Sequence, residues 1–346
     1  MKRFAFAVPG DLSTPTGGYA YDRRMIAELG NLGWQIDIIA LGEGFPFPSE
    51  ATRKTANERL LAVPHDQIVV IDGLALGVLP EAATKLGRLL ALVHHPLAVE
   101  SGISAGQAEQ LRASEQAALS SARHVVVTSA TTAQQLSSHY AVPAGRITVV
   151  RPGSDPVAQA QRSANGTVRL LSVGAVVPRK GYDVLIAALA TLPDLPWRLT
   201  IAGDCTRNRN AAAQLQADID RHGLGSRVVV LGAVSPHRLG ELYAEADIFA
   251  LASRFEGYGM AYAEAIAHGL PVIGTIAGAI PSTVPPDSGL LVAPDDVTAL
   301  AAALRRLIGD ANERKRFASA ARKAAAQFPT WAESARIFSR TLEAIA

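Results

Sequence analysis

Short apolar runs alternate with helix-like segments along the whole chain, and this alternation limits the fold more than any other feature. In the N-terminal part the runs are RFAFAV, WQIDIIAL, QIVVIDG, RLLALVHH and HVVVTS. Continuous apolar runs separated by helices are typical of parallel strands in a sheet that is covered on both faces. The sequence therefore predicts a doubly wound α/β domain.

The alternation stops at residues 151–167, RPGSDPVAQAQRSANGT, whose composition is typical of a linker. It resumes with the runs VRLLSVGAV, WRLTIAGD, RVVVLGAV, DIFALAS and LPVIGT, and ends in helical segments. A chain of 346 residues is long enough for two such domains. We predict Rossmann-like domains at 1–152 and 168–330, a linker at 153–167, and a helix at 331–346 that crosses back to the first domain. Their strand ends are expected to face a shared cleft, where open parallel sheets bind ligands.

Charge and cysteine content restrict the class of protein. The net charge is +2, which argues against nucleic acid as a partner. Cys205 is the single cysteine, so no internal disulfide can form and a reducing compartment is indicated. The start of the chain lacks the long apolar run of a signal peptide, and no run approaches the length of a membrane span. We expect a soluble cytoplasmic protein.

The stretch SRFEGYGMAYAEAIAHGLPVIGT places Glu256 before a predicted helix and Glu264 inside it, with a glycine-rich turn between them. A helix N-terminus with glycines at its entrance favours an anion, and carboxylates accept hydrogen bonds from sugar hydroxyls. This arrangement suits a diphosphate that carries a sugar at each end, which is the shape of a nucleotide sugar. The alternative for either glutamate alone is an exposed position on a surface loop or an amphipathic helix.

The same stretch resembles the Glu-x7-Glu motif of glycosyltransferase family 4, whose members are retaining enzymes of GT-B fold. LLSVGAVVPRKGYDVLIAAL and LYAEADIFALAS match the family as well, and the resemblance is strongest over residues 168–295. It implies that Glu264 binds the nucleotide ribose and that Glu256 contacts the donor sugar. It also implies that backbone groups of the intervening turn contact donor sugar and phosphate, at Gly257, Tyr258, Gly259 and Met260. In this interpretation the second domain binds the nucleotide sugar and the first lies on the acceptor side.

Arg179 and Lys180 follow the first strand of the second domain, where fixed cations would stabilise charge on a departing diphosphate. By resemblance they act without a metal, and the Asp-x-Asp at 218–220 is interpreted as a chance match. Many relatives have arginine after the glycine that corresponds to Gly174, but this chain has Ala175. The resemblance assigns Gly174 to the donor site and the strand end near Val234 to the nucleotide base.

In the first domain Gly17 and Gly18 resemble the family's N-terminal glycine loop, which packs against donor or acceptor phosphate. His94 and His95 end a strand on the predicted cleft side. A strand-end histidine commonly sits by the donor sugar in this family, and His94 aligns best with it, with His95 as the alternative. Adjacent residues on a strand point to opposite faces, so the pair is a poor metal site.

We therefore expect a retaining, metal-independent hexosyltransferase that uses a donor such as UDP- or GDP-hexose, needs no cofactor, and glycosylates a hydroxyl of a glycan, lipid or small molecule. The candidate catalytic residues are His94, Glu256, Arg179 and Lys180. Two alternatives are a GT-B sugar-nucleotide epimerase and a non-catalytic nucleotide-sugar-binding protein. The mixed charges of the segment GEGFPFPSEATRKTANERLLAV favour a solvated helix but leave open weak peripheral contact with the inner face of a membrane. The oligomeric state is not indicated.

Overall fold

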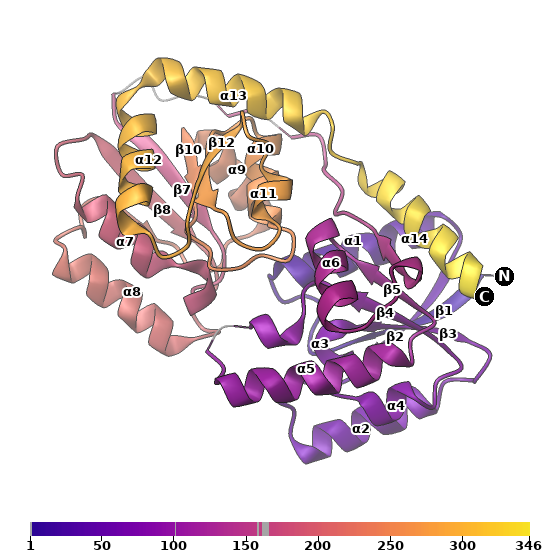
Figure 1. Cartoon of the computed structure of the whole chain (residues 1–346). Coiled ribbons are helices and arrows are strands. Elements are labelled where there is room, and N and C mark those ends of the chain that lie inside the picture. Colours follow the sequence, from indigo (N-terminus) through magenta and orange to yellow (C-terminus); the bar gives the residue numbers. More distant parts are fainter. Residues whose placement is uncertain (1, 101, 158, 161–165) are drawn as a thin grey trace. The chain divides into compact units, whose positions relative to one another are not determined.

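The computed structural model describes residues 2–100, 102–157, 159–160 and 166–346. The chain divides into two compact units, one made of Met1–Gly153 with Pro329–Ala346 and the other of Ser154–Phe328 (Figure 1). Of the predicted linker, residues 158 and 161–165 lie outside the described residues.

The first unit is built on a six-stranded parallel sheet in the order β2-β1-β3-β4-β5-β6. Its strands are β1 (Arg3–Val8), β2 (Gln35–Ala40), β3 (Ile68–Asp72), β4 (Arg88–Val93), β5 (His124–Val127) and β6 (Ile147–Val149). Its helices are α1 (Gly17–Asn31), α2 (Glu50–Leu61), α3 (Gly73–Leu76), α4 (Pro80–Ala83), α5 (Ala105–Ser120), α6 (Ala130–His139) and α14 (Trp331–Ile345), with short 3-10 turns at η1 (Leu97–Val99) and η2 (Ala144–Arg146).

Helix α14 completes this unit although it comes last in the sequence. A reciprocal capping box between Thr330 and Glu333 starts the helix, and such caps typically stabilise a helix by about 1 kcal/mol. The helix packs against α1 (Figure 1). In this contact the rings of Trp331 and Tyr21 lie 5.8 Å apart. Phe338 and Leu342 are fully buried on the same face. The C-terminal segment is thus part of the first unit's core.

The second unit repeats the architecture with the strand order β12-β11-β10-β7-β8-β9, again all parallel. Its strands are β7 (Val168–Val173), β8 (Trp197–Ala202), β9 (Val228–Val230), β10 (Ile248–Ala250), β11 (Val272–Thr275) and β12 (Gly289–Val292). Its helices are α7 (Tyr182–Ala190), α8 (Arg209–Arg221), α9 (Pro236–Glu245), α10 (Met260–Ala267), α11 (Ile280–Thr283), α12 (Val297–Gly309) and α13 (Ala311–Ala325), with a 3-10 turn at η3 (Pro178–Lys180). The predicted doubly wound architecture is confirmed in both units.

Strand adjacency decides which loops can meet. In the second unit β10 pairs directly with β7, so the loops that follow these two strands leave the same edge of the sheet side by side. In the first unit β3 pairs with β4 in the same way. Residues far apart in the sequence are therefore brought together at the carboxyl ends of neighbouring strands.

The described helices include none that is both long enough and apolar enough to cross a lipid bilayer.

Candidate functional site

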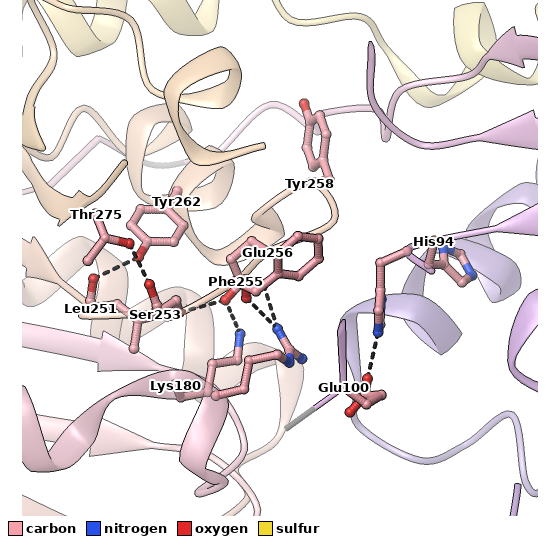
Figure 2. A network of polar contacts seen from close by, with 12 residues as sticks. His94, Glu100, Lys180, Leu251, Ser253, Phe255, Glu256, Tyr258, Tyr262 and Thr275 are labelled. Carbon is pink, nitrogen blue, oxygen red and sulfur yellow. Dashed lines mark hydrogen bonds and ion pairs between the residues drawn. The ribbon is translucent and has the colours of Figure 1, made fainter. Parts of the chain in front are cut away.

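Glu256 lies at the centre of a buried polar network in the second unit. The Nζ of Lys180 donates to its Oε1 over 2.6 Å, and the hydroxyl of Ser253 donates to the same oxygen over 2.6 Å (Figure 2). The Nη1 of Arg179 lies 3.3 Å from its Oε2. The side chains of Lys180, Arg179 and Glu256 are 13%, 16% and 9% exposed, so these charges are largely shielded from water.

The two cations control the ionisation of this carboxylate. Burial would raise the pKa of Glu256, but attraction to Lys180 and Arg179 outweighs it and holds the pKa at about 2. Burial also lowers the pKa of Lys180, and repulsion from Arg179 adds to this, while Glu256 opposes both. When all three groups are ionised, the cluster has two positive charges and one negative charge. An anionic ligand at this position would neutralise the remaining positive charge.

Two close approaches of the main chain make this cluster. Gly181 follows η3 in the left-handed conformation, and a Cβ there would lie 2.0 Å from the carbonyl oxygen of Ala252, so only glycine fits. The second close approach is made by Arg254. Its backbone N–H donates to the carbonyl of Arg179 over 2.7 Å, and its guanidinium forms two hydrogen bonds to Asp183. The loop after β7 is thus fastened to the loop after β10.

The glycine-rich turn ends at the N-terminus of α10. Gly259 is the N-cap, with φ of 91° and no side-chain cap for the first helical N–H groups, and Met260 is the first helical residue. Gly278 has a positive φ, and a Cβ on it would lie 2.3 Å from the carbonyl oxygen of Glu256. That oxygen accepts a hydrogen bond from the N–H of Ala279 over 2.8 Å. The conformation of the turn is therefore fixed by the chain that packs behind it.

Glu264 is the fifth residue of α10 and is half-buried. The hydroxyl of Tyr243, on α9, lies 2.9 Å from its Oε2. Burial raises the pKa of Glu264, whereas the hydrogen bond from Tyr243 and the charge of Lys180 lower it. Lys180 therefore acts electrostatically on both glutamates of the motif.

The other residues predicted for this unit lie at neighbouring strand ends. Gly174 directly follows β7, and its N–H donates to the carbonyl of Ala202 over 3.0 Å. A Cβ on Gly174 would lie 2.9 Å from the Cε of Lys180, which places this glycine beside the cation. Val234 lies between β9 and α9 and is half-buried.

In the first unit His94 is held by two buried aspartates. Its Nε2 lies 3.1 Å from Oδ1 of Asp22, on α1, and 3.5 Å from Oδ2 of Asp72, at the end of β3. Burial opposes protonation, but the two carboxylates prevail and raise the pKa of His94 to about 10, so the ring is an imidazolium at neutral pH. Gly18 packs on this ring, since a Cβ there would lie 3.3 Å from Cδ2.

His95 has a different partner. Its Nε2 lies 2.5 Å from Oε1 of Glu100, and both side chains are about one-fifth exposed. The structure thus separates the two histidines, with His94 turned to Asp22 and Asp72 and His95 to Glu100. Among the described residues, Asp22, Asp72 and His94 form a group whose ligand atoms lie within 4.8 Å of one another, as a metal site requires. The Nε2 of His94 is hydrogen-bonded to Oδ1 of Asp22 and forms an ion pair with Oδ2 of Asp72.

Sequence reasoning did not identify Asp22, Asp72, Ser253 or Tyr243. One signal was available for Asp72, because it ends an apolar strand next to the strand that ends at the two histidines. Asp22 and Tyr243 lie within helices, where nothing in the local pattern distinguishes a buried polar side chain from an exposed one.

Comparison with known proteins gives consistent matches. Residues 155–324 match the family model described as glycosyl transferases group 1. A D-inositol 3-phosphate glycosyltransferase of Xylanimonas cellulosilytica is 34% identical over 220 residues, which cover 59% of this chain and 52% of the relative. An MMP alpha-(1->4)-mannosyltransferase of Mycolicibacterium hassiacum is 26% identical over 88% of this chain and 77% of the relative. The chain spans about half the length of several curated relatives that it matches.

Solved structures share the fold of the whole chain. Sucrose-phosphate synthase from Thermosynechococcus elongatus superposes with a TM-score of 0.83 and 21% identity, over 99% of this chain and 100% of that one. HepE of Anabaena in complex with UDP and glucose gives a TM-score of 0.80 at 19% identity, over 99% and 100% of the two chains. These likenesses confirm the predicted GT-B fold.

Proposed function

The chain belongs to the glycosyl transferases group 1 family, the retaining glycosyltransferase family 4, and on this premise we propose that it transfers a hexose from a nucleotide sugar to a hydroxyl acceptor. The observation that carries the proposal is the cluster of Lys180, Arg179 and Glu256 in front of the N-terminus of α10. Two buried cations with one carboxylate between them suit a diphosphate whose attached sugar presents hydroxyl groups.

Each group has a separate task in the proposed reaction. Lys180 and Arg179 neutralise the charge that develops on the leaving diphosphate, while main-chain N–H groups at the start of α10 add partial positive charge. Glu256 accepts hydrogen bonds from donor-sugar hydroxyls, and Glu264 does so from the ribose. Gly174, Gly257, Tyr258 and Gly259 would let the main chain approach the donor, with the base near Val234.

In the proposed chemistry the bond from the sugar's anomeric carbon to the diphosphate oxygen breaks as the acceptor oxygen bonds to the same face of that carbon. The departing phosphate oxygen takes the acceptor's proton, so no protein nucleophile is needed and the anomeric configuration is retained. The transition state resembles a separated ion pair, which is the arrangement that buried cations stabilise most.

We propose the donor sugar and the acceptor by chemical class. The relatives' names include glycosyl transfer to an inositol phosphate and mannosyl transfer, and one structural neighbour holds UDP and glucose. The UDP of that neighbour supports a UDP-hexose donor, and the resemblance to the family allows a GDP-hexose as well. The inositol phosphate in the relatives' names supports an acceptor with several hydroxyls. We assign the acceptor side to the first unit. Within that unit we propose His94, with His95 as the alternative, as the group beside the donor sugar, and Gly17 and Gly18 as the loop that packs against donor or acceptor phosphate.

The test begins with a thermal-shift panel of UDP-, GDP- and ADP-hexoses. The donor that stabilises the protein is then incubated with sugar, polyol and polyol-phosphate acceptors, and products are identified by mass spectrometry and by the anomeric coupling in proton NMR. A hexosylated acceptor with the donor's anomeric configuration is expected. A change of sugar configuration without an acceptor would indicate an epimerase instead, and binding without any turnover would indicate a non-catalytic binding protein.

A further inference from the structure

Tyr243 of α9 is a buried tyrosine whose hydroxyl faces α10. It is 2% exposed, and its oxygen lies 2.9 Å from Oε2 of Glu264 and 3.2 Å from the carbonyl oxygen of Ala261. A hydroxyl has one hydrogen to donate, so these two acceptors compete for it. An ionised carboxylate is the stronger acceptor and also the nearer one.

The ring of Tyr243 is fixed in place by aromatic neighbours. It stacks on the imidazole of His268 with centroids 5.1 Å apart and planes 13° apart, and it stacks on Phe249 at 6.1 Å. His268 is the C-cap of α10, and its N–H donates to the carbonyl of Glu264 over 3.0 Å. The hydroxyl is therefore held at a constant position relative to the helix that carries Glu264.

This geometry assigns different tasks to the two carboxylate oxygens. Oε2 accepts the hydrogen from Tyr243, which fixes the rotation of the carboxylate about its last bond. In the proposed complex Oε1 accepts the hydrogen bond from the ligand, and its orientation follows from that of Oε2. Removing the hydroxyl would leave the ring packed but would free the carboxylate to rotate.

We infer that Tyr243 is a positioning residue for Glu264, and that their hydrogen bond makes nucleotide binding depend on a ribose hydroxyl. The inference rests on the proposed function, because it takes the ligand of Glu264 to be the ribose of a nucleoside diphosphate. It adds a specific claim: discrimination between ribose and deoxyribose depends on a residue that does not itself touch the nucleotide.

The test is a comparison of ligands as well as of proteins. UDP, GDP and ADP are titrated into the wild-type chain by calorimetry, and the tightest binder is compared with its 2′-deoxy and 3′-deoxy forms. The wild type should bind one deoxy form more weakly than the ribonucleotide. Y243F should lose about tenfold in affinity for the ribonucleotide and much less for that deoxy form, as expected when a hydrogen bond to a charged group is lost. A merely structural defect would weaken both ligands equally.

Two further variants keep the test decisive. E264A removes the carboxylate that Tyr243 positions, so adding Y243F to E264A should cost little further affinity. Y21F removes another buried tyrosine hydroxyl, which donates to the carbonyl of Val150 in the first unit, and should leave the ligand comparison unchanged. Melting temperatures of all variants check that they are folded.

The outcomes separate this inference from the function on which it rests. If the wild type binds none of the three nucleoside diphosphates, the proposed function fails. If the wild type distinguishes ribose from deoxyribose and Y243F does so to the same degree, only the role of Tyr243 is overturned.

Discussion

The Nζ of Lys180 lies 2.6 Å from Oε1 of Glu256, although the two residues are 76 positions apart in the sequence. Both side chains are at least 87% buried, so their attraction is stronger than that of a surface pair, whose net contribution is usually below about 1 kcal/mol. In the proposed donor complex the diphosphate would share Lys180 with Glu256. The carboxylate of Glu256 therefore neutralises part of the positive charge of Lys180 that would otherwise attract the diphosphate.

Replacing Glu256 by glutamine tests that competition. We expect E256Q to bind the nucleoside diphosphate several-fold more tightly, because Lys180 and Arg179 lose a competing anion. Turnover of the nucleotide sugar should fall by about a hundredfold or more, since a contact beside the reacting carbon is lost. Calorimetry and steady-state kinetics measure the two effects separately. E241Q, at an exposed glutamate of α9 that pairs with Arg238, is the control and should change neither. Unaltered turnover in E256Q would contradict the role of Glu256.

The Asp22 carboxyl group predicts a pH-dependent stability. Burial raises its pKa to about 7 in the folded chain, whereas about 3.9 is expected when it is unfolded. The folded state thus binds this proton more tightly, and its stability falls as pH rises from about 4 to about 7. Asp22→Asn removes the group that ionises. The free energy of unfolding of the variant minus that of the wild type should therefore be larger at pH 8 than at pH 5, by roughly 2 kcal/mol.

Urea unfolding at the two pH values measures this difference. Asp66→Asn, at an exposed position of the same unit, serves as the control and should show no comparable change. A constant difference between Asp22→Asn and wild type across this pH range would show that the cluster with His94 does not hold its protons as described.

Much of this site follows from the sequence because of strand adjacency. Arg179 and Lys180 follow one apolar run and Glu256 follows another, so parallel pairing of β7 with β10 is sufficient to bring them together. The sheet edges were harder to predict. Strands β6 and β12 were not expected, since each is only three or four residues long and partly exposed, which leaves too little pattern to recognise.

Partners that lie within helices could not be predicted. Tyr243 precedes Glu264 by 21 positions, and only the packing of α9 against α10 shows that their side chains meet. Likewise, the pairing of His94 with Asp22 brings a residue of α1 to one that follows β4, 72 positions later, which no local spacing encodes. Conversely, the assignment of His94 to the donor sugar came from resemblance alone and stays a proposal.

Metal independence is a further expectation of the account. Arg179 and Lys180 already supply two positive charges where the diphosphate is proposed to bind, so a divalent ion is not required to neutralise the leaving group. Nucleotide-sugar turnover should continue in excess EDTA at close to its original rate. Complete loss of turnover that Mn²⁺ or Mg²⁺ restores would contradict this and would direct attention to Asp22, Asp72 and His94 as ligands.

The most direct measurement is a calorimetric titration of the wild-type chain and of E264A with UDP, GDP and ADP. The account predicts one-to-one binding of at least one of them to the wild type. It also predicts that E264A weakens this binding by roughly tenfold to a hundredfold, because a hydrogen bond from ribose to a half-buried carboxylate is lost. E245A, at an exposed glutamate of α9, should bind like the wild type. Absence of binding by all three nucleotides, or an E264A variant with unchanged affinity, would contradict the central claim.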